Sequence, residues 1–178
     1  MRYPLLVLPL LLLGCASTED STSYATMMAA PDEVFDAEAR ERLFSQLERL
    51  MGRWQMDGPE GPVYIEFDLT AGGSVLRETM FPGTESEMVN MYSLNGNSLM
   101  MTHYCAGKNQ PRMKGHIDDE GNLSFEAFAV TDLADSSGHY MDSLTLAFID
   151  EDTIEERWTS IAKGEQGEMP VFRLTRVR

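Results

Sequence analysis

The sequence predicts a mainly β protein, an antiparallel up-and-down barrel of about 8–10 strands preceded by one amphipathic α-helix. Three observations support this prediction. Apolar residues recur at helical spacing in a segment that ends before Gly52. After Gly52 they alternate with polar residues, which is the period of half-buried strands. Turn-forming residues interrupt this alternation roughly every 8–12 residues, as in a meander that closes on itself.

The N-terminus has the pattern of an export signal. Arg2 precedes an apolar run over residues 5–13, which is too short to span a bilayer as a helix. The run ends in Leu-Leu-Gly-Cys at Cys15, and this ending resembles the lipobox of bacterial lipoproteins. The resemblance implies that residues 1–14 are removed as a signal peptide and that Cys15 is acylated. We therefore expect a lipid bilayer of the cell envelope as the partner of Cys15.

The residues that follow the cysteine predict a location and a tether. Inner-membrane retention in many Gram-negative bacteria resembles an Asp rule at the position of Ala16, so we expect the outer membrane, with the domain facing the periplasm. Residues 15–31 are rich in Ser, Thr and Ala without an apolar period, which predicts a flexible tether. Residues 32–178 then form one domain, the helix plus the barrel.

The predicted helix follows Pro31. Ala39, Leu43, Leu47 and Leu50 recur at steps of four, four and three, and charged residues occupy the opposite face. We expect Gly52 to end this helix at the C′ position, where a left-handed backbone costs glycine least.

The strands are predicted from alternation and from the turns between them. Asn95-Gly96 is the strongest hairpin signal, because both residues tolerate positive φ. A first strand opens at Gly52, and nine more are expected over residues 63–69, 74–81, 88–94, 99–105, 112–117, 123–130, 140–149, 153–161 and 169–177.

Two resemblances accompany this pattern. Gly52-Arg53-Trp54 at the first strand and Arg176 in the last strand resemble the lipocalin or calycin superfamily signature. The resemblance implies a calycin-like barrel whose base is closed by an arginine stacked on a tryptophan; the helix departs from it by preceding the barrel. Residues 79–113, with Thr-His-Tyr-Cys-Ala and Asn-Gln-Pro-Arg-Met, resemble a group of secreted bacterial domains without an established activity.

The composition is strongly acidic, with a net charge of −15 that becomes about −16 when Arg2 is removed with the signal. Such a chain is repelled by nucleic acid and by anionic lipid head groups, so nucleic acid is not an expected partner. The acidic residues are scattered, Glu155 and Glu156 among them, and we expect them on a solvated surface.

The candidate ligand-binding residues begin with one strand. His103 and Cys105 lie two residues apart, so they share a face with Met101. After lipidation of Cys15 no cysteine is left to pair with Cys105, and we expect Cys105 to be buried. A soft metal site with two histidines and Cys105 is an alternative to a packed or hydrogen-bonded lining, although the spacing matches no known ligand signature.

Two charged residues extend this candidate site. Arg112 returns beside His103 after a turn, and Glu78 is expected inside the barrel. Buried charges are paired or costly, so these two side chains either form a salt bridge or bind the polar head of a ligand. Tyr92 is a further candidate contact.

The leading functional hypothesis is a membrane-anchored lipoprotein whose barrel binds a small, partly apolar molecule through the residues above. One alternative is a hydrolase or isomerase that acts on a small envelope metabolite in the same cavity. Another is an envelope interaction protein with a filled barrel. The sequence contains no nucleophile elbow, P-loop, dinucleotide-binding glycines or His-Glu-x-x-His, so we assign no catalytic residue, metal or cofactor.

Overall fold

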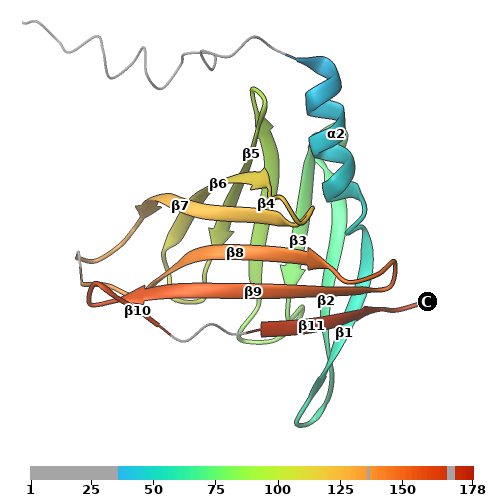
Figure 1. The fold of residues 1–178 in the computed structure, drawn as a ribbon. Coiled ribbons are helices and arrows are strands. Elements are labelled where there is room, and N and C mark those ends of the chain that lie inside the picture. Colours follow the sequence, from blue (N-terminus) through green and yellow to red (C-terminus); the bar gives the residue numbers. More distant parts are fainter. Residues whose placement is uncertain (1–35, 136, 168–170) are drawn as a thin grey trace, which may run out of the picture. The chain divides into compact units, whose positions relative to one another are not determined.

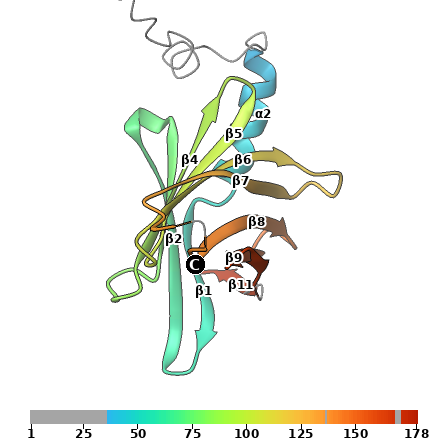
Figure 2. The same cartoon turned by 90° about the vertical axis from the view of Figure 1, so that its left-hand side faces the viewer.

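The protein forms a closed antiparallel barrel with one helix before it (Figures 1 and 2). The computed structural model describes residues 36–135, 137–167 and 171–178, so the predicted signal peptide, lipid attachment at Cys15 and tether lie outside the described residues. The helix α2 spans Ala37–Glu48 and the 3-10 turn η1 Ala71–Gly73. The strands are β1 Gly52–Gly58, β2 Gly61–Thr70, β3 Val75–Met80, β4 Met88–Asn95, β5 Ser98–Tyr104, β6 Gln110–Ile117, β7 Leu123–Thr131, β8 Tyr140–Phe148, β9 Thr153–Ala162, β10 Glu165–Gln166 and β11 Val171–Arg176.

The strands follow a meander with one insertion. Each strand from β1 to β9 pairs with the next along the chain, and β11 pairs with both β9 and β1. These pairings close the sheet on itself, and closure removes the exposed edges at which sheets aggregate. The two residues of β10 pair with the last residues of β9, beyond the part of β9 that pairs with β11. The predicted fold class, a mainly β barrel of up to ten strands behind one helix, is confirmed.

The helix ends earlier than predicted. Asp36 caps its N-terminus by accepting a hydrogen bond from the Ala39 backbone, but the helix stops at Glu48 rather than just before Gly52. The carbonyl groups beyond its end are bound by side chains of the barrel instead. Trp54 Nε1 donates to the carbonyl of Leu50 at 2.7 Å. Tertiary partners therefore replace the expected glycine cap.

The predicted contact between the first and last strands is present. Trp54 and Arg176 are paired across β1 and β11, and the Arg176 guanidinium lies 4.1 Å from the centre of the Trp54 ring. The same guanidinium donates to the carbonyls of Met51 at 2.6 Å and Arg49 at 2.8 Å. One side chain therefore stacks on the first strand and binds the chain leaving the helix.

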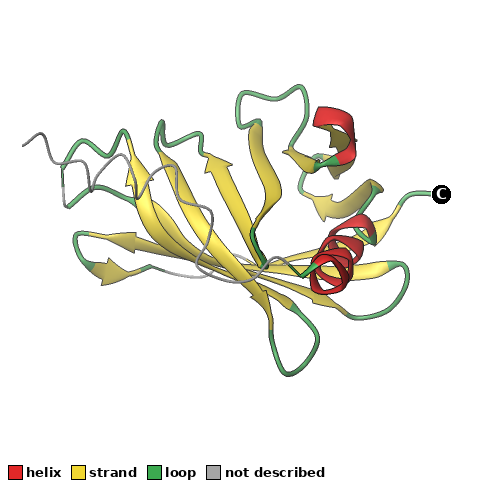
Figure 3. Ribbon diagram, turned by 90° about the horizontal axis from the view of Figure 1, so that it is seen from above, coloured by secondary structure: helices red, strands yellow, loops and turns green. Residues whose placement is uncertain are grey.

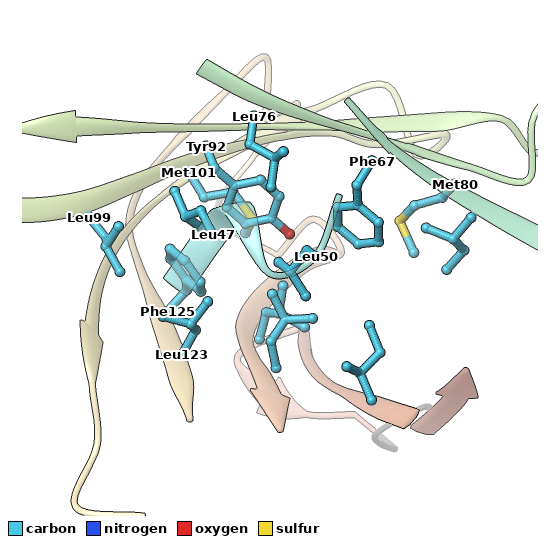
Figure 4. Close-up of a cluster of buried hydrophobic side chains, with 14 of the residues drawn as sticks. Leu47, Leu50, Phe67, Leu76, Met80, Tyr92, Leu99, Met101, Leu123 and Phe125 are labelled. Carbon is cyan, nitrogen blue, oxygen red and sulfur yellow. The ribbon is translucent and has the colours of Figure 1, made fainter. Parts of the chain in front are cut away.

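The helix and the Trp54 contact lie at one end of the barrel. The start of the helix is bound to this end of the barrel, because the backbone N–H of Asp36 donates to Asn97 in the turn between β4 and β5. Figure 3 shows the helix against the rim of the barrel from above. Leu47 and Leu50 are fully buried in the same cluster as Phe67, Tyr92 and other side chains from the strands (Figure 4). No helix in the described residues is both long and apolar enough to cross a membrane.

We predict that Trp54→Ala lowers the free energy of unfolding by about 3–5 kcal/mol, because the ring is buried and leaves a cavity. Arg176→Ala loses less, through the stacking and the two carbonyl contacts. Arg173→Ala on the same strand is the control, since its ion pair with Glu155 is more exposed. Chemical denaturation measures all three, and equal values for Trp54→Ala and Arg173→Ala would contradict the proposed closure.

Candidate functional site

A network of polar side chains crosses the interior of the barrel. Glu78 of β3 is fully buried, and its Oε2 atom accepts hydrogen bonds from Asn90 Nδ2 at 2.7 Å and from the Tyr92 hydroxyl at 2.6 Å. Asn90 and Tyr92 are alternate residues of β4, so both point inward beside Glu78. Burial raises the pKa of the Tyr92 hydroxyl well above its ordinary value, and this hydroxyl remains a donor.

A second buried carboxyl meets the first from the opposite wall. Glu156 of β9 is fully buried, and its Oε2 atom accepts from Trp158 Nε1 at 3.3 Å. Burial raises the pKa of the Glu156 carboxyl well above its ordinary value, and the nearby charge of Glu78 adds to this effect. Burial also raises the pKa of Glu78, but the hydrogen bonds from its neighbours oppose that shift.

The two buried carboxyl groups affect each other's protonation. Each has an enclosed oxygen, Oε1, without a hydrogen-bond partner among the described residues. The hydrogen bonds from Asn90 and Tyr92 favour the charged form of Glu78, whereas burial and the charge of Glu78 favour the protonated form of Glu156.

His103 of β5 continues the network toward one end of the barrel. Its Nδ1 atom lies 2.6 Å from Asn90 Oδ1, and its ring lies 5.0 Å from that of Trp158. Burial lowers the pKa of the His103 imidazole to about 4, so the ring is neutral at neutral pH. The buried histidine therefore adds no charge to the interior at neutral pH.

A pocket of about 150 Å³ lies against His103, at the end of the barrel away from the helix. Its wall is formed by the ends of several strands and is almost entirely apolar. The lining residues are Met80, Met88, His103, Cys105, Met141, Trp158 and Phe172. Larger hollows of about 270 to 380 Å³ occur elsewhere, but their lining residues do not include the buried network. The pocket at His103 is therefore the candidate functional site.

The structure brings together most of the predicted site residues. Glu78 and Tyr92 belong to the network, while His103 and Cys105 line the pocket. Met101 is buried two residues before His103, in the core beneath the pocket. Cys105 is half-buried rather than fully buried, because it lies just past the end of β5, where the Gly107 backbone donates to its sulfur at 3.3 Å.

The predicted position of Arg112 is wrong. Arg112 is exposed on the outer face of β6, with its guanidinium 5.5 Å from the centre of the Phe128 ring. In the sheet it pairs with Thr102, which alternates with the inward-facing His103. Arg112 therefore forms no salt bridge with Glu78, whose partners are uncharged or protonated groups.

The remaining histidines lie apart from His103. His116 is exposed on the outer face of β6, and His139 is exposed before β8. Among the described residues, no three His, Cys, Asp or Glu side chains gather in a way that could hold a metal ion.

Sequence reasoning missed three residues of the site, Asn90, Glu156 and Trp158. Glu156 was expected on a solvated surface, yet it alternates with Ile154 and Trp158, which are both buried. That alternation is the signal that places it inward. Asn90 likewise occupies an inward-facing position of β4, and the residues next to it along the strand are apolar.

Comparison with known proteins gives no relative to guide the assignment: no protein family model and no curated protein matches this chain. The fold and the site define the chain as a closed antiparallel barrel with two buried carboxyl groups and a neutral histidine beside an apolar pocket. Chemically, this arrangement can hold a small apolar body and offer it one hydrogen bond.

We predict that Glu156→Gln becomes more stable relative to the wild type as pH rises above about 4.5, the ordinary pKa of the carboxyl. The folded wild type retains a proton that its unfolded state releases above that pH, so its stability is progressively lost; glutamine carries no such proton. Denaturant unfolding at several pH values measures the difference.

The matched control for this prediction is Glu155→Gln. Hydrogen bonds from Arg157 and Arg173 lower the pKa of the Glu155 carboxyl. The wild type therefore gains stability as pH rises toward about 4.5, the ordinary pKa of the carboxyl, and the variant loses stability relative to it over that range. If the two variants show the same trend with pH, Glu156 does not carry a proton in the folded protein.

Proposed function

We propose that this protein is a membrane-anchored lipoprotein of the bacterial envelope whose barrel binds a small, partly apolar molecule. The observation that carries the proposal is the pocket at His103, where an apolar wall ends on a buried polar network. Sites for small molecules combine these features, since apolar walls supply affinity and a few fixed polar groups supply orientation.

The size of the pocket limits the ligand. An apolar protein cavity of roughly 150 Å³ binds a molecule as large as benzene. We therefore infer a ligand of about that size, or a larger one that inserts a group of that size. Small ligands gain at most about 1.5 kcal/mol per heavy atom, so we expect dissociation constants from about micromolar to millimolar.

An enzyme in the same cavity is the second candidate, and one observation favours it. Cys105 and the neutral His103 both line the pocket, and a neutral imidazole is the state required of a general base. A hydrolase using this pair needs a reactive Cys105 thiol in the folded protein. The binding function needs none, so the rate of thiol labelling of the folded chain discriminates between the two.

Anchoring by lipid completes the proposal. It is supported by the Leu-Leu-Gly-Cys ending at Cys15 and by the Ser, Thr and Ala-rich segment that follows. The net charge of −15 gives the domain no electrostatic attraction to anionic lipid, so the lipid itself has to hold the protein at a membrane. We place the domain at the outer membrane, facing the periplasm.

We predict that Met88→Trp weakens binding of benzene at least tenfold, because the larger ring occupies the mouth of the pocket. Met91→Trp on the same strand is the control, since Met91 alternates with the inward-facing residues and faces away from the pocket. Ligand-observed NMR measures both affinities. Equal affinities for the two variants, or no binding of benzene to the wild type, would contradict the proposed site.

We predict that Cys15→Ser releases the protein from the membrane fraction and abolishes incorporation of labelled fatty acid. Fractionation of the bacterial host and metabolic labelling with palmitate measure the two effects. Cys105→Ser is the matched control and leaves both unchanged. Continued labelling of the Cys15→Ser variant would show that the lipid is attached elsewhere.

A further inference from the structure

We propose that the ligand of this pocket is an uncharged molecule that donates an O–H or N–H hydrogen bond to His103 Nε2, such as a phenol-type hydroxyl compound, and is not a carboxylate. This inference rests on the proposed function and adds the chemical class of the ligand. It follows from the direction of every hydrogen bond that leads to His103.

The direction of the network is fixed at Glu78. Glu78 Oε2 accepts hydrogen bonds from the nitrogen of the Asn90 amide, Nδ2, at 2.7 Å and from the Tyr92 hydroxyl at 2.6 Å. The other end of the amide, Oδ1, therefore faces His103 and can only accept. His103 Nδ1 at 2.6 Å must carry the proton and donate it to Asn90.

This assignment leaves His103 Nε2 as a lone-pair acceptor. The burial that lowers the pKa of the ring to about 4 keeps Nε2 unprotonated at neutral pH. The enclosed side-chain nitrogens and oxygens without a partner, among the described residues, are Glu78 Oε1, Asn109 Oδ1 and Glu156 Oε1. Nε2 is not one of them and bonds to no described residue, so it is reached from the pocket that His103 lines.

The other polar atoms of the pocket wall already have partners. Trp158 Nε1 donates to Glu156, and the Cys105 sulfur accepts from the Gly107 backbone. The rest of the wall consists of methionine and phenylalanine side chains. A bound molecule therefore meets one vacant acceptor, His103 Nε2, in an otherwise apolar surrounding.

Charge restricts the ligand further. Among the described residues no Lys or Arg is buried, so an anion in the pocket would have no cation to pair with. An ammonium ion carries three N–H donors, of which the pocket could satisfy one. A neutral molecule with one donor is the class that leaves no polar group unsatisfied.

The test compares benzene, phenol, benzoate and benzylammonium as ligands of the full chain carrying Cys15→Ser, so that no detergent micelle competes for apolar probes. We expect phenol to bind roughly threefold to tenfold tighter than benzene at pH 7, which is the net effect of one hydrogen bond. We expect benzoate and benzylammonium to bind more weakly than benzene.

Two further measurements identify the acceptor. In ¹⁵N NMR, we expect phenol to shift the Nε2 resonance of His103. Benzene donates no hydrogen bond, so it does not produce this shift. In the His103→Phe variant we expect phenol and benzene to bind with equal affinity. The Met91→Leu variant, changed on the outward face of β4, keeps the preference for phenol.

The outcomes separate this inference from the proposed function. Binding of benzene without any preference for phenol overturns the inference and leaves the binding site in place. Tightest binding by benzoate or benzylammonium overturns the inference as well. Failure of all four probes to bind overturns the proposed function itself.

Discussion

The burial of the Glu78 carboxyl inside the barrel is the constraint on which the rest of the interior depends. A carboxylate in an apolar core costs several kcal/mol unless hydrogen bonds replace its water. Tyr92 and Asn90 supply two donors, and the buried Glu156 on the opposite wall interacts with the same carboxyl. Because Asn90 is committed to Glu78, its carbonyl fixes the proton of His103. The state of the residue at the pocket is thus determined by a charge two hydrogen bonds away.

The two ends of the barrel are built differently. At the helix end, Arg176 and Trp54 bind the carbonyls that follow α2, and Leu47 and Leu50 fill the space above the core. At the opposite end none of the described helices covers the strands, and the wall consists of methionine, cysteine and aromatic side chains around His103. Thioethers adapt their shape to a partner more easily than branched side chains. One end is therefore closed by specific contacts, and the other retains space for a ligand.

Much of the fold could be predicted from the sequence, because one buried face forces apolar and polar residues to alternate along each strand. The contact of Trp54 with Arg176 was predicted only through the resemblance of Gly52-Arg53-Trp54 and Arg176 to the calycin signature. The end of the helix could not, since it depends on carbonyl partners supplied by those same residues. Local pattern has no access to such tertiary contacts.

The site was predictable only in part for the same reason. His103 and Cys105 were predicted from strand parity, and Glu78 and Tyr92 were named as candidates without it. Arg112 was placed inside the barrel although buried Met113 is its neighbour. Glu156 was missed because acidic residues in an acidic chain are usually solvated. Its partner Glu78 lies on a strand across the barrel, and no sequence pattern relates the two.

The central claim is that the buried network holds His103 as a neutral imidazole with its proton on Nδ1. The most direct measurement is ¹⁵N NMR of the His103 side chain over a pH titration of the folded protein. The account predicts the Nδ1–H tautomer throughout the neutral range, with a pKa of about 4. A midpoint near the ordinary histidine value of 6.5, or a proton on Nε2 at neutral pH, would contradict it.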